Sequence, residues 1–554
     1  MKSSETISQP DVYLIDIAER SAGSYRQIWQ PHFASLPKIR ADSSHRNTSN
    51  TCLLSILLLL ILLRFPAAPL AAQVPAFPGA KGAGASSVGG RGGKIIEVTN
   101  LNAKGPGSFR AACAASGARI VIFKVSGTID LGGTLNITHP YLTIAGQTAP
   151  GEGVQIKNSD IRIYTHDVVI RYVRIRPGSG GPVSSHCIFI GDAAYNIIVD
   201  HCSLQWARDE NFTVYSGDIP GASITDITSS WNLISEGIAR GFPPQHDQHA
   251  AGMIVGSVAD ADKVERISIH HNIISNNEFR NPYLKCKSAQ FVNNIVYNWA
   301  WWGMLVEGGA TLDLIGNLFK QGSAFVGDKV YFYTDWAISW NVMAGDNGNL
   351  GAPGDPSIYV TGNKDVNNWT DAAGDNWGII HAVNEGNNWH IVGSVKRAFE
   401  RLVPQSNTHP ISVTSVSGLE TSLLPYVGAY RRLNADSTWT VNRDSVDTRL
   451  IQEYKNGTGA LLYDEDDVGG YPSYAPATGY TDTDHDGMPD TWEITYGLNP
   501  NSAADSSGDA DGDGYTNVEE FLNGTSPVSA SELNPPARLK IIGASASTNN
   551  VTKN

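Results

Sequence analysis

The stretch RISIHHNIISNNEFRNPYLKCKSAQFVNNIVYNWAWWGMLVEGGATLDLIGNLF (266–319) decides the fold of this chain. It is a succession of short β-branched runs broken by Gly, Asn and Asp, with no heptad and no long amphipathic helix. An asparagine followed by aliphatic residues recurs within it and around it, at Asn232, Asn272, Asn294, Asn317 and Asn341. The intervals are 40, 22, 23 and 24 residues, the first being roughly twice the others. Such a period, with about three short strands in each turn, predicts a parallel β-helix.

The same pattern of short β-branched runs extends from about Val74 to Gly345. Earlier runs of this kind are RIVIFKVSGTI (119–129), YLTIAG (141–146), DVVIRYVRIRPG (167–178) and NIIVDHCSLQW (196–206). Stacked asparagines at one corner of a β-helix bond to one another through their side-chain amides, which explains an asparagine at a fixed phase. The alternative is a β-sandwich, in which strands recur about every 8–12 residues.

The rest of the chain divides by composition. Residues 345–395 are rich in Gly, Asp, Asn and Trp and are expected to form long loops, whereas 396–475 hold mixed short elements. Within the latter, DSVDTRLIQEY (444–454) predicts a short helix. The Pro/Tyr/Gly/Thr stretch GGYPSYAPATGYT (469–481) predicts a linker, and beyond it the composition changes sharply to Asp and Gly.

Composition and charge narrow the function. Hydrophobic residues make up 41% and charged residues 17% of the chain, which excludes wholesale disorder. The balance of 40 Lys and Arg against 54 Asp and Glu gives a net charge of −14, which argues against a general binder of nucleic acid or anionic membranes. A chain of this charge that binds an anionic polymer needs local cations or a metal.

The N-terminal region predicts export. LLSILLLLILL (53–63) is too short for a comfortable membrane span and suits the core of a signal peptide, with small residues before Gln73 as a cleavage zone. A short membrane anchor is the alternative. The residues before this core are left out of the fold reasoning. After cleavage four cysteines remain, which are too few for a disulfide scaffold, and their pairing stays open.

Two acidic segments near the C-terminus predict calcium binding. DTDHDGMPDTWE (482–493) and DADGDGYTNVEE (509–520) both match D-x-D-x-D-G-x5-E, in which alternate carboxylates and a final Glu wrap one hard cation. The predicted ligands are Asp482, Asp484, Asp486, Asp490, Glu493, Asp509, Asp511, Asp513, Asn517 and Glu520. Each segment runs into a short predicted helix. The pair resembles thrombospondin type 3/dockerin-like calcium repeats, which implies an EF-hand-like module with a structural or attachment role.

Polar residues also concentrate in three segments of the predicted β-helix, where a purely structural strand would not need them. The first is DHCSLQWARDE (200–210), the second HDQH (246–249), and the third HHN (270–272) with RNPYLK (280–285). Parallel coils stack equivalent positions about 4.8 Å apart, so residues distant in sequence can line one groove. Acidic and basic groups together in a groove suit an anionic polymer bridged by a divalent cation.

These segments resemble the polysaccharide lyase family 1 pectate lyases. The resemblance runs from FPGAKGAGASSVGGRGGKIIEVTNLNAKGPGSFRAA (77–112) through TIAGQTAPG (143–151), RYVRIRPG (171–178) and VDHCSLQWARDE (199–210) to HHNIISNNEFRNPYLK (270–285). It continues near the end in VGAYRRLNADS and DSVDTRLIQEYKNGTG (444–459). The resemblance implies an all-β, right-handed, single-stranded parallel β-helix and calcium-dependent β-elimination of polygalacturonate.

The resemblance also implies roles for residues. The family assigns the base to the first arginine of R-x-P-x-x-R/K, here Arg280, and substrate contact to the second basic position, Lys285. Because guanidinium is normally protonated, Arg280 as an electrostatic clamp with Lys285 as the base is the alternative. Asp209 matches the first calcium aspartate, and Glu210 is a candidate substitute ligand.

Several positions depart from the family pattern. His186 and Thr213 stand where the family has calcium aspartates, and His249 lies in the segment where a lysine is usual. We expect His249, His271, Arg174 and Arg176 to contact substrate. Arg174 and Arg176 share one face of a strand and could instead pair with acids.

We therefore divide the chain into a leader with signal peptide (1–72), a β-helix lyase domain (73–470), a linker (471–481), a calcium-repeat module (482–530) and a tail (531–554). The expected cofactor is Ca²⁺ and the expected partner an anionic plant-type polysaccharide such as pectin, with no nucleic acid and no stable membrane insertion after cleavage. We expect a monomer that docks, if at all, through the calcium module. The competing functions are a noncatalytic glycan-binding β-helix and a hydrolase, which would need converging carboxylates.

Overall fold

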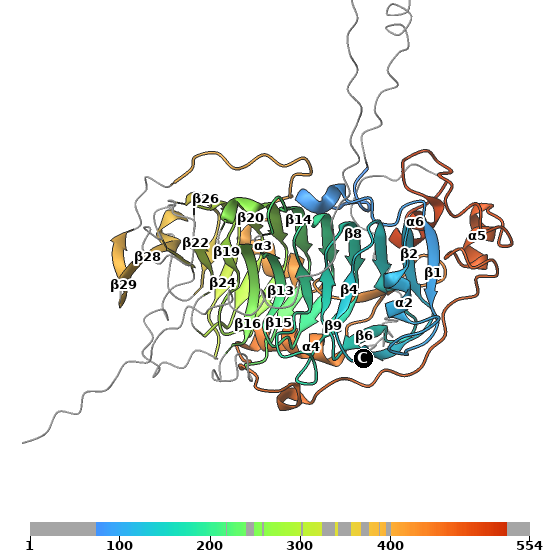
Figure 1. The fold of residues 1–554 in the computed structure, drawn as a ribbon, viewed down its shortest axis with the longest axis horizontal. Helices are drawn as coiled ribbons and strands as arrows, with labels where there is room; N and C mark the ends of the chain where they lie inside the picture. The colour runs from blue at the N-terminus through green and yellow to red at the C-terminus, as the bar shows by residue number, and fades with distance from the viewer. Residues whose placement is uncertain are drawn as a thin grey trace, which may run out of the picture. The chain divides into compact units, whose positions relative to one another are not determined.

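The β-branched runs form coils of three short strands each, and the coils stack side by side (Figure 1). The computed structural model describes residues 74–528 apart from 218, 240–248, 258–259, 301–302, 308, 324–337, 342–355, 367–375, 387 and 395–399. The predicted leader and signal peptide and the tail therefore lie outside the described residues. No helix within the described ranges is long and apolar enough to cross a membrane.

Three sheets of parallel strands make up the coils, and each coil contributes one strand to each sheet. The exception to the parallel pairing is the last strand of sheet 3, Asn388–Ser394, which pairs antiparallel with its neighbour. Sheet 1 contains β1 (Lys94–Val98), β2 (Arg119–Phe123), β5 (Leu142–Ala145), β8 (His166–Arg171), β11 (Tyr195–Asp200), β14 (Ile224–Ser230), β17 (Val264–His270), β20 (Ser288–Val292), β23 (Thr311–Ile315) and β26 (Ser357–Thr361). Sheet 2 contains β3 (Gly127–Asp130), β6 (Val154–Lys157), β9 (Arg174–Arg176), β12 (Ser203–Gln205), β15 (Leu233–Ser235), β18 (Ile273–Ser275), β21 (Ile295–Tyr297), β24 (Leu318–Lys320) and β27 (Lys364–Asp365). Sheet 3 contains β4 (Leu135–Ile137), β7 (Ile161–Ile163), β10 (Ile188–Ile190), β13 (Glu210–Ser216), β16 (Ala251–Ser257), β19 (Tyr283–Lys285), β22 (Leu305–Glu307), β25 (Ile338–Asn341), β28 (Ile380–Gly386) and β29 (Asn388–Ser394). This arrangement confirms the parallel β-helix and contradicts the β-sandwich.

Alternation along each strand separates the core from the outer faces. In β13, for example, Phe212 and Val214 point into the apolar core, while Thr213 between them lies outside it. The core is a column of Ile, Val, Leu and Phe from every coil, closed at the β1 end by α2 (Phe109–Ala114), whose Phe109 is fully buried. The free cysteines 113, 187, 202 and 286 are buried, and they form no disulfide in this part of the chain.

An asparagine ladder follows the corner between sheets 1 and 2, as predicted. The backbone N–H of Asn232 donates to the side-chain oxygen of Asn272 at 2.9 Å, so the 40-residue interval is one coil with a long loop. The same bond links Asn272 to Asn294 at 2.9 Å and Asn294 to Asn317 at 2.8 Å. The next rungs are Asn363 and Asn376. Asn341, predicted as a rung, instead lies in β25 of sheet 3.

The segments after the coils cover the outer face of sheet 2. The predicted helix at 444–454 is confirmed as α4 (Ser445–Asn456), whose first turn is capped by Asp444. Side chains of α4 and α3 (Val416–Leu423) pack on outward residues of β15, β18 and β21, including Leu233, Ile273 and Ile295. A short hairpin of β30 (Arg431–Leu433) and β31 (Trp439–Val441) follows α3.

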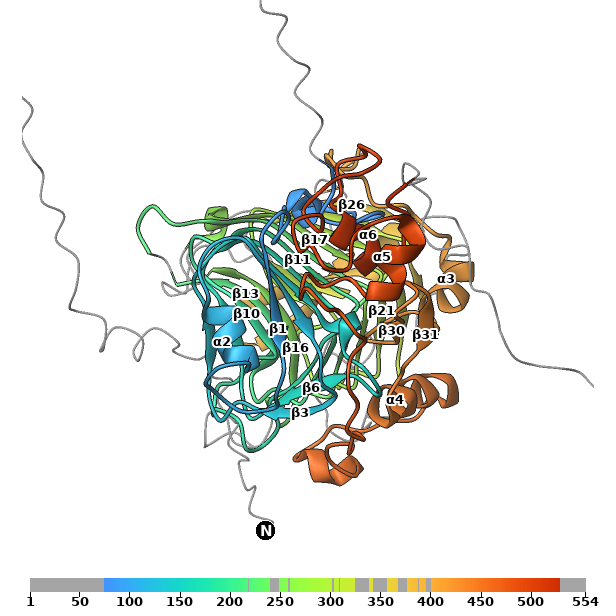
Figure 2. The same ribbon diagram turned by 90° about the vertical axis from the view of Figure 1, so that its right-hand side faces the viewer.

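Among the described residues, short 3₁₀ turns lie at Ala83–Ser86, Gly146–Thr148, Ala261–Lys263, Asn376–Ile379 and Glu465–Val468. The predicted linker contacts the β-helix, since the Tyr471 hydroxyl donates to the carbonyl of Arg176 at 3.0 Å. The acidic loops end in α5 (Asp490–Tyr496) and α6 (Asn517–Asn523), as predicted, and both helices lie beside the β1 end of the coils (Figures 1 and 2).

Candidate functional site

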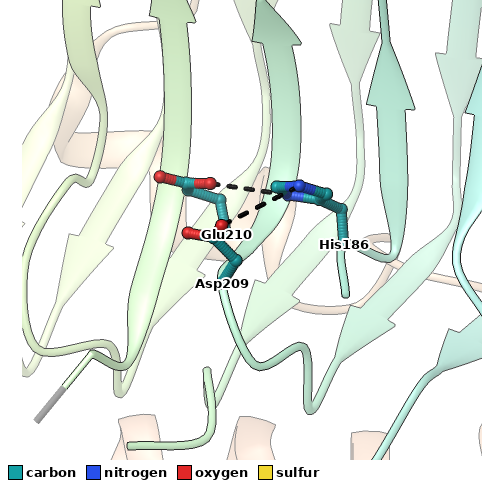
Figure 3. A group of neighbouring side chains, drawn as sticks. All are labelled: His186, Asp209 and Glu210. Carbon is teal, nitrogen blue, oxygen red and sulfur yellow. Dashed lines mark ion pairs between the residues drawn. The ribbon is translucent and has the colours of Figure 1, made fainter. Parts of the chain in front are cut away.

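A buried cluster of His186, Asp209 and Glu210 lies where chain segments enter sheet 3 (Figure 3). His186 precedes β10, while Asp209 and Glu210 lie at the start of β13, and β10 and β13 are adjacent parallel strands. One ligand atom from each of the three lies within 4.8 Å of the others. Stacking of neighbouring coils therefore brings together residues that are 23 and 24 positions apart in the sequence.

Three of the four carboxylate oxygens of the cluster lie within hydrogen-bond distance of a protein donor. Oδ1 of Asp209 is 2.9 Å from Nε2 of His249, and Oδ2 is 4.0 Å from Nε2 of His186. Oε1 of Glu210 accepts a short hydrogen bond from the Arg280 guanidinium. Its Oε2 lies 3.3 Å from the Thr213 hydroxyl and 3.4 Å from Nδ1 of His186. The Arg280 guanidinium, two imidazole rings and the Thr213 hydroxyl thus surround both acids.

This environment separates the pKa values of the two acids. Burial and the neighbouring Asp209 charge raise the pKa of Glu210 to about 8, against the opposing effect of Arg280. Burial would also raise the pKa of Asp209, but the hydrogen bond from His249 and the charge of His186 hold it below its usual range. Burial lowers the pKa of His186. Two adjacent carboxyls therefore differ in the ease with which they hold a proton.

Arg280 is the catalytic candidate that a polymer can reach. It lies in the segment between β18 and β19 with a left-handed backbone, φ 57°, and 18% of its side chain is exposed. Its guanidinium carbon lies 5.0 Å from the centre of the Phe279 ring, and the His249 ring packs edge-on against the same ring at 5.3 Å. Lys285, at the end of β19, is only 4% exposed.

The structure contradicts substrate binding by Arg174 and Arg176, because both are buried beneath α4. The Arg176 guanidinium is 2.6 Å from Asp444 and 3.1 Å from Asp447, and Nε of Arg174 is 3.4 Å from Asp444. The alternative interpretation, pairing with acids, is confirmed. These ion pairs attach the start of α4 to sheet 2.

His271 is also misassigned as a substrate residue. It lies at the corner between β17 and β18, on a different corner from the cluster, and is 7% exposed. Its ring stacks on Trp231 at 4.6 Å, and Trp231 stacks in turn on His201 at 5.5 Å. The neighbouring Asp200 carboxylate lies 2.6 Å from Nδ1 of His201 and so holds the end of this stack of rings.

Sequence reasoning missed a row of side chains on the outer face of sheet 3. The register aligns Arg162, Phe189, Thr213, Ile254 and Tyr283 across five adjacent strands. The Arg162 guanidinium is held by Asp160 at 2.5 Å and lies 5.2 Å from the centre of the Phe189 ring. The signal was present in the strands, since each residue lies at the outward position between two core residues.

The first C-terminal loop gathers more acids than its motif predicts. Asp482, Asp484 and Asp486 form one group, and Asp486, Glu493 and Asp505 form a second, each with ligand atoms within 4.8 Å of one another. Burial and the other acids raise the pKa of Asp486 to about 7 and that of Glu493 to about 8. Asp505 lies outside the D-x-D-x-D-G-x5-E pattern and was not predicted.

Six carboxylate oxygens in and beside this loop have no protein hydrogen-bond partner, whereas both oxygens of Asp482 and Oδ1 of Asp486 accept from backbone N–H groups. The six buried atoms without a partner are Oδ1 and Oδ2 of Asp484, Oδ2 of Asp486, Oε1 and Oε2 of Glu493, and Oδ1 of Asp505. Buried carboxylates without a partner are costly, and convergent oxygens are the ligands that Ca²⁺ prefers. Gly487 adopts φ 93° at the tight turn, as the motif requires.

The second loop is less complete. Asp509, Asp511 and Asp513 come together, and one buried oxygen of Asp511 has no hydrogen-bond partner. Asp490 and Asn517, the two predicted ligands that stand ninth in their motifs, make hydrogen bonds within their own loops. Asp490 accepts bonds from the backbone N–H and hydroxyl of Thr483, both at 2.7 Å, and Asn517 accepts from the backbone N–H of Ala510 at 3.3 Å. Their side chains close the loops, and a ligand role for them stays a prediction.

Comparison with known proteins shows to which family this chain belongs. No family model matches the chain. It is 31% identical over 452 residues to a probable pectate lyase C of Aspergillus flavus, covering 80% of this chain and 92% of that protein. A probable pectate lyase C of Emericella nidulans is 32% identical over 447 residues, covering 80% and 90%.

Solved structures were also compared. A pectate lyase from Bacillus sp. N165, in complex with trigalacturonate, is 15% identical with a TM-score of 0.42, covering 63% of this chain and 98% of that one. The cedar pollen allergen Jun a 1 is 18% identical with a TM-score of 0.42, covering 63% and 92%. By its identity to the fungal proteins over most of their length, the chain belongs to the pectate lyase family of polysaccharide lyases.

Proposed function

We propose that this chain cleaves (1,4)-α-D-galacturonan by β-elimination and releases 4,5-unsaturated oligogalacturonides. Family membership supports the reaction, and the carrying observation in the structure is the exposed edge of Arg280 beside a buried acid–histidine cluster. The reaction removes the proton at C5, next to the C6 carboxylate, and expels the sugar linked at C4. That proton is poorly acidic because the carboxylate is already anionic, so positive charge near the carboxylate is required.

Arg280 supplies that charge in our proposal. The family assigns the base to this position, but the guanidinium donates a hydrogen bond to Glu210, and arginine side chains are ordinarily charged donors and not proton acceptors. We therefore assign Arg280 as the electrostatic clamp on the C6 carboxylate. Lys285, almost fully buried, would add positive charge beneath the groove and is a weaker candidate for the base.

His249 is the proton acceptor that best fits this arrangement. Asp209 lies 2.9 Å from Nε2 of His249, and a carboxylate that orients an imidazole is a common feature of general bases. His249 and Arg280 pack against the same Phe279 ring, so both reach toward the same part of the groove. This role refines the substrate contact predicted for His249.

Calcium, the cation of the family, fits the two regions differently. Beside Arg280, three of the four oxygens of Asp209 and Glu210 already have protein donors, and the third member of the cluster offers an imidazole nitrogen and no oxygen. Ca²⁺ takes 6–8 oxygen ligands, so these residues do not fit a resident Ca²⁺, and we derive no step through one. The unpartnered oxygens of the first C-terminal loop do fit Ca²⁺.

The test is ultraviolet absorbance of the unsaturated product while the purified protein acts on polygalacturonate with Ca²⁺ present. We expect absorbance to rise. A folded protein that binds the polymer without a rise would support the noncatalytic alternative, and saturated products would support a hydrolase. We also propose that residues 1–72 direct export and that the anionic polysaccharide is met outside the cell; secretion of a tagged full-length chain tests this.

A further inference from the structure

Strand β2 is buried on both faces, and the C-terminal loops cover one of them. Val121 and Phe123 point into the core of the β-helix, whereas Ile120 and Ile122 belong to a second apolar cluster. That cluster also contains side chains from the acidic loops and from α5 and α6, namely Met488, Trp492, Val518, Phe521 and Leu522. If the loops moved away, the outer face of β2 would become exposed to water.

Charged contacts join the same two regions. Lys124, directly after β2, lies 3.6 Å from Oδ2 of Asp482, the first residue of the first acidic loop. Its Nζ also donates to the carbonyl of Tyr480 at 2.9 Å. In the second loop region, Arg91 bonds to both oxygens of Glu519 at 3.0 Å. The acidic loops are therefore attached to the β1 end of the β-helix by their own potential ligands and neighbours.

The cation site and the apolar contact share one helix. Glu493 is 0% exposed, and neither of its oxygens has a hydrogen-bond partner. Its neighbour Trp492 on α5 is 2% exposed and packs in the cluster with β2. Asp505 approaches Glu493 and Asp486 from the connection between the two loops. A cation that draws these acids together would therefore fix α5 in its packed position.

We propose that Ca²⁺ bound by Asp482, Asp484, Asp486, Glu493 and Asp505 is a latch that holds the C-terminal loops over β1 and β2. The five carboxylates form two adjoining groups that share Asp486, and they repel one another unless a cation neutralises them. Cation binding to the folded state alone then stabilises both the loops and the first coils. The C-terminal segment is thus an integral cover of the β-helix and not an independent docking module.

Hydrogen–deuterium exchange of the purified protein, in Ca²⁺ and in EDTA, tests the latch. In EDTA we expect amides of both 482–523 and 119–123 to exchange faster, by on the order of tenfold or more, because the cover and β2 open together. We also expect Ca²⁺ to raise the melting temperature by on the order of 5 °C. Neither readout depends on lyase activity, so failure here is distinct from failure of the proposed reaction.

Variants distinguish the effect of cation binding from the general effect of removing a negative charge. Glu493→Gln should abolish the calcium-induced shift in melting temperature, and Asp505→Asn should reduce it if Glu493→Gln does not fold. Asp262→Asn removes an exposed acid far from the loops and should leave the shift unchanged. The latch is wrong if Ca²⁺ changes neither exchange nor melting. It is equally wrong if 482–523 opens in EDTA while 119–123 stays protected, which would indicate an independent module.

Discussion

Two clusters of buried acids differ in what balances them. In the groove, Asp209 and Glu210 face His186, His249 and Arg280, so protein side chains supply the positive charge. In the first C-terminal loop, both oxygens of Asp484, both of Glu493 and Oδ2 of Asp486 have no protein hydrogen-bond partner. The same residue types are therefore paired with protein side chains in one place and left largely unpaired in the other.

The difference between the two clusters predicts how removal of calcium will affect each of them. Buried carboxylates must be neutralised by protons, by protein cations or by metal ions. Around Asp209 and Glu210, protein cations do this, whereas the carboxylates of the first C-terminal loop remain available to a metal ion. Chelation should therefore act first on the C-terminal cover and on the stability of the first coils, and the groove should respond mainly to changes in its own side chains.

The largest effect should come from removing the cation of the groove. Arg280→Ala removes the proposed clamp and leaves Glu210 buried without its main partner, so we expect kcat to fall about 10²–10³-fold. Product absorbance on polygalacturonate measures this. Arg266→Ala, an exposed arginine on sheet 1 paired with Asp226, is the matched control and should retain activity. Near-normal activity of Arg280→Ala would refute the clamp.

A third set of buried acids sharpens the comparison through stability alone. Asp444 pairs with Arg174 and Arg176 beneath α4, so Asp444→Ala leaves two buried guanidinium groups without that partner. We expect a loss of about 3–5 kcal/mol in the free energy of unfolding, measured by denaturant titration with Ca²⁺ present. Asp262→Ala should change it little. Equal stability of the two variants would contradict the structural role of these arginines.

The pH dependence of stability separates the two clusters. Without a cation, the raised pKa values of Glu493, about 8, and Asp486, about 7, mean that the folded protein holds protons that the unfolded chain has released. The stability they contribute is therefore lost as pH rises toward 8. Ca²⁺ should remove that loss, because it binds the ionised carboxylates.

Glu210, with a pKa of about 8, should produce a similar but smaller fall that Ca²⁺ leaves in place. Melting temperatures between pH 5 and 9, in Ca²⁺ and in EDTA, measure both effects. Identical pH curves in the two conditions would show that the loop acids do not bind Ca²⁺.

The smallest effect concerns the outer row of sheet 3. Arg162 is held in place by Asp160 and lies over Phe189, two strands from Thr213 in the groove. Arg162→Ala should raise KM for polygalacturonate about 2–5-fold with kcat unchanged, since a partly exposed ion pair contributes little. Lys287→Ala, an exposed cation beside Glu265, is the control. A fall in kcat instead would place Arg162 closer to the chemistry than we infer.

Much of the fold could be predicted because its signals are local and repeated. Each coil must place β-branched residues inside and an asparagine at one corner, so Asn272, Asn294 and Asn317 recur at nearly constant spacing. The rung after Asn317 was misassigned to Asn341 instead of Asn363, because a longer coil hides the period. The clustering of acids in the first C-terminal loop was predictable for the same reason, since most of them lie within one twelve-residue motif.

The sequence by itself thus determined the β-helix, the helices α4 to α6 and the presence of acidic loops. Only the tertiary structure decided the partners of buried charges. Arg280 meets Glu210 across 70 positions, Arg176 meets Asp444 across 268, and Asp505 joins Glu493 from outside the motif. A strand pattern specifies which side chains point outward, but stacking of coils and the cover packed on them decide whether an outward arginine meets substrate or a buried acid.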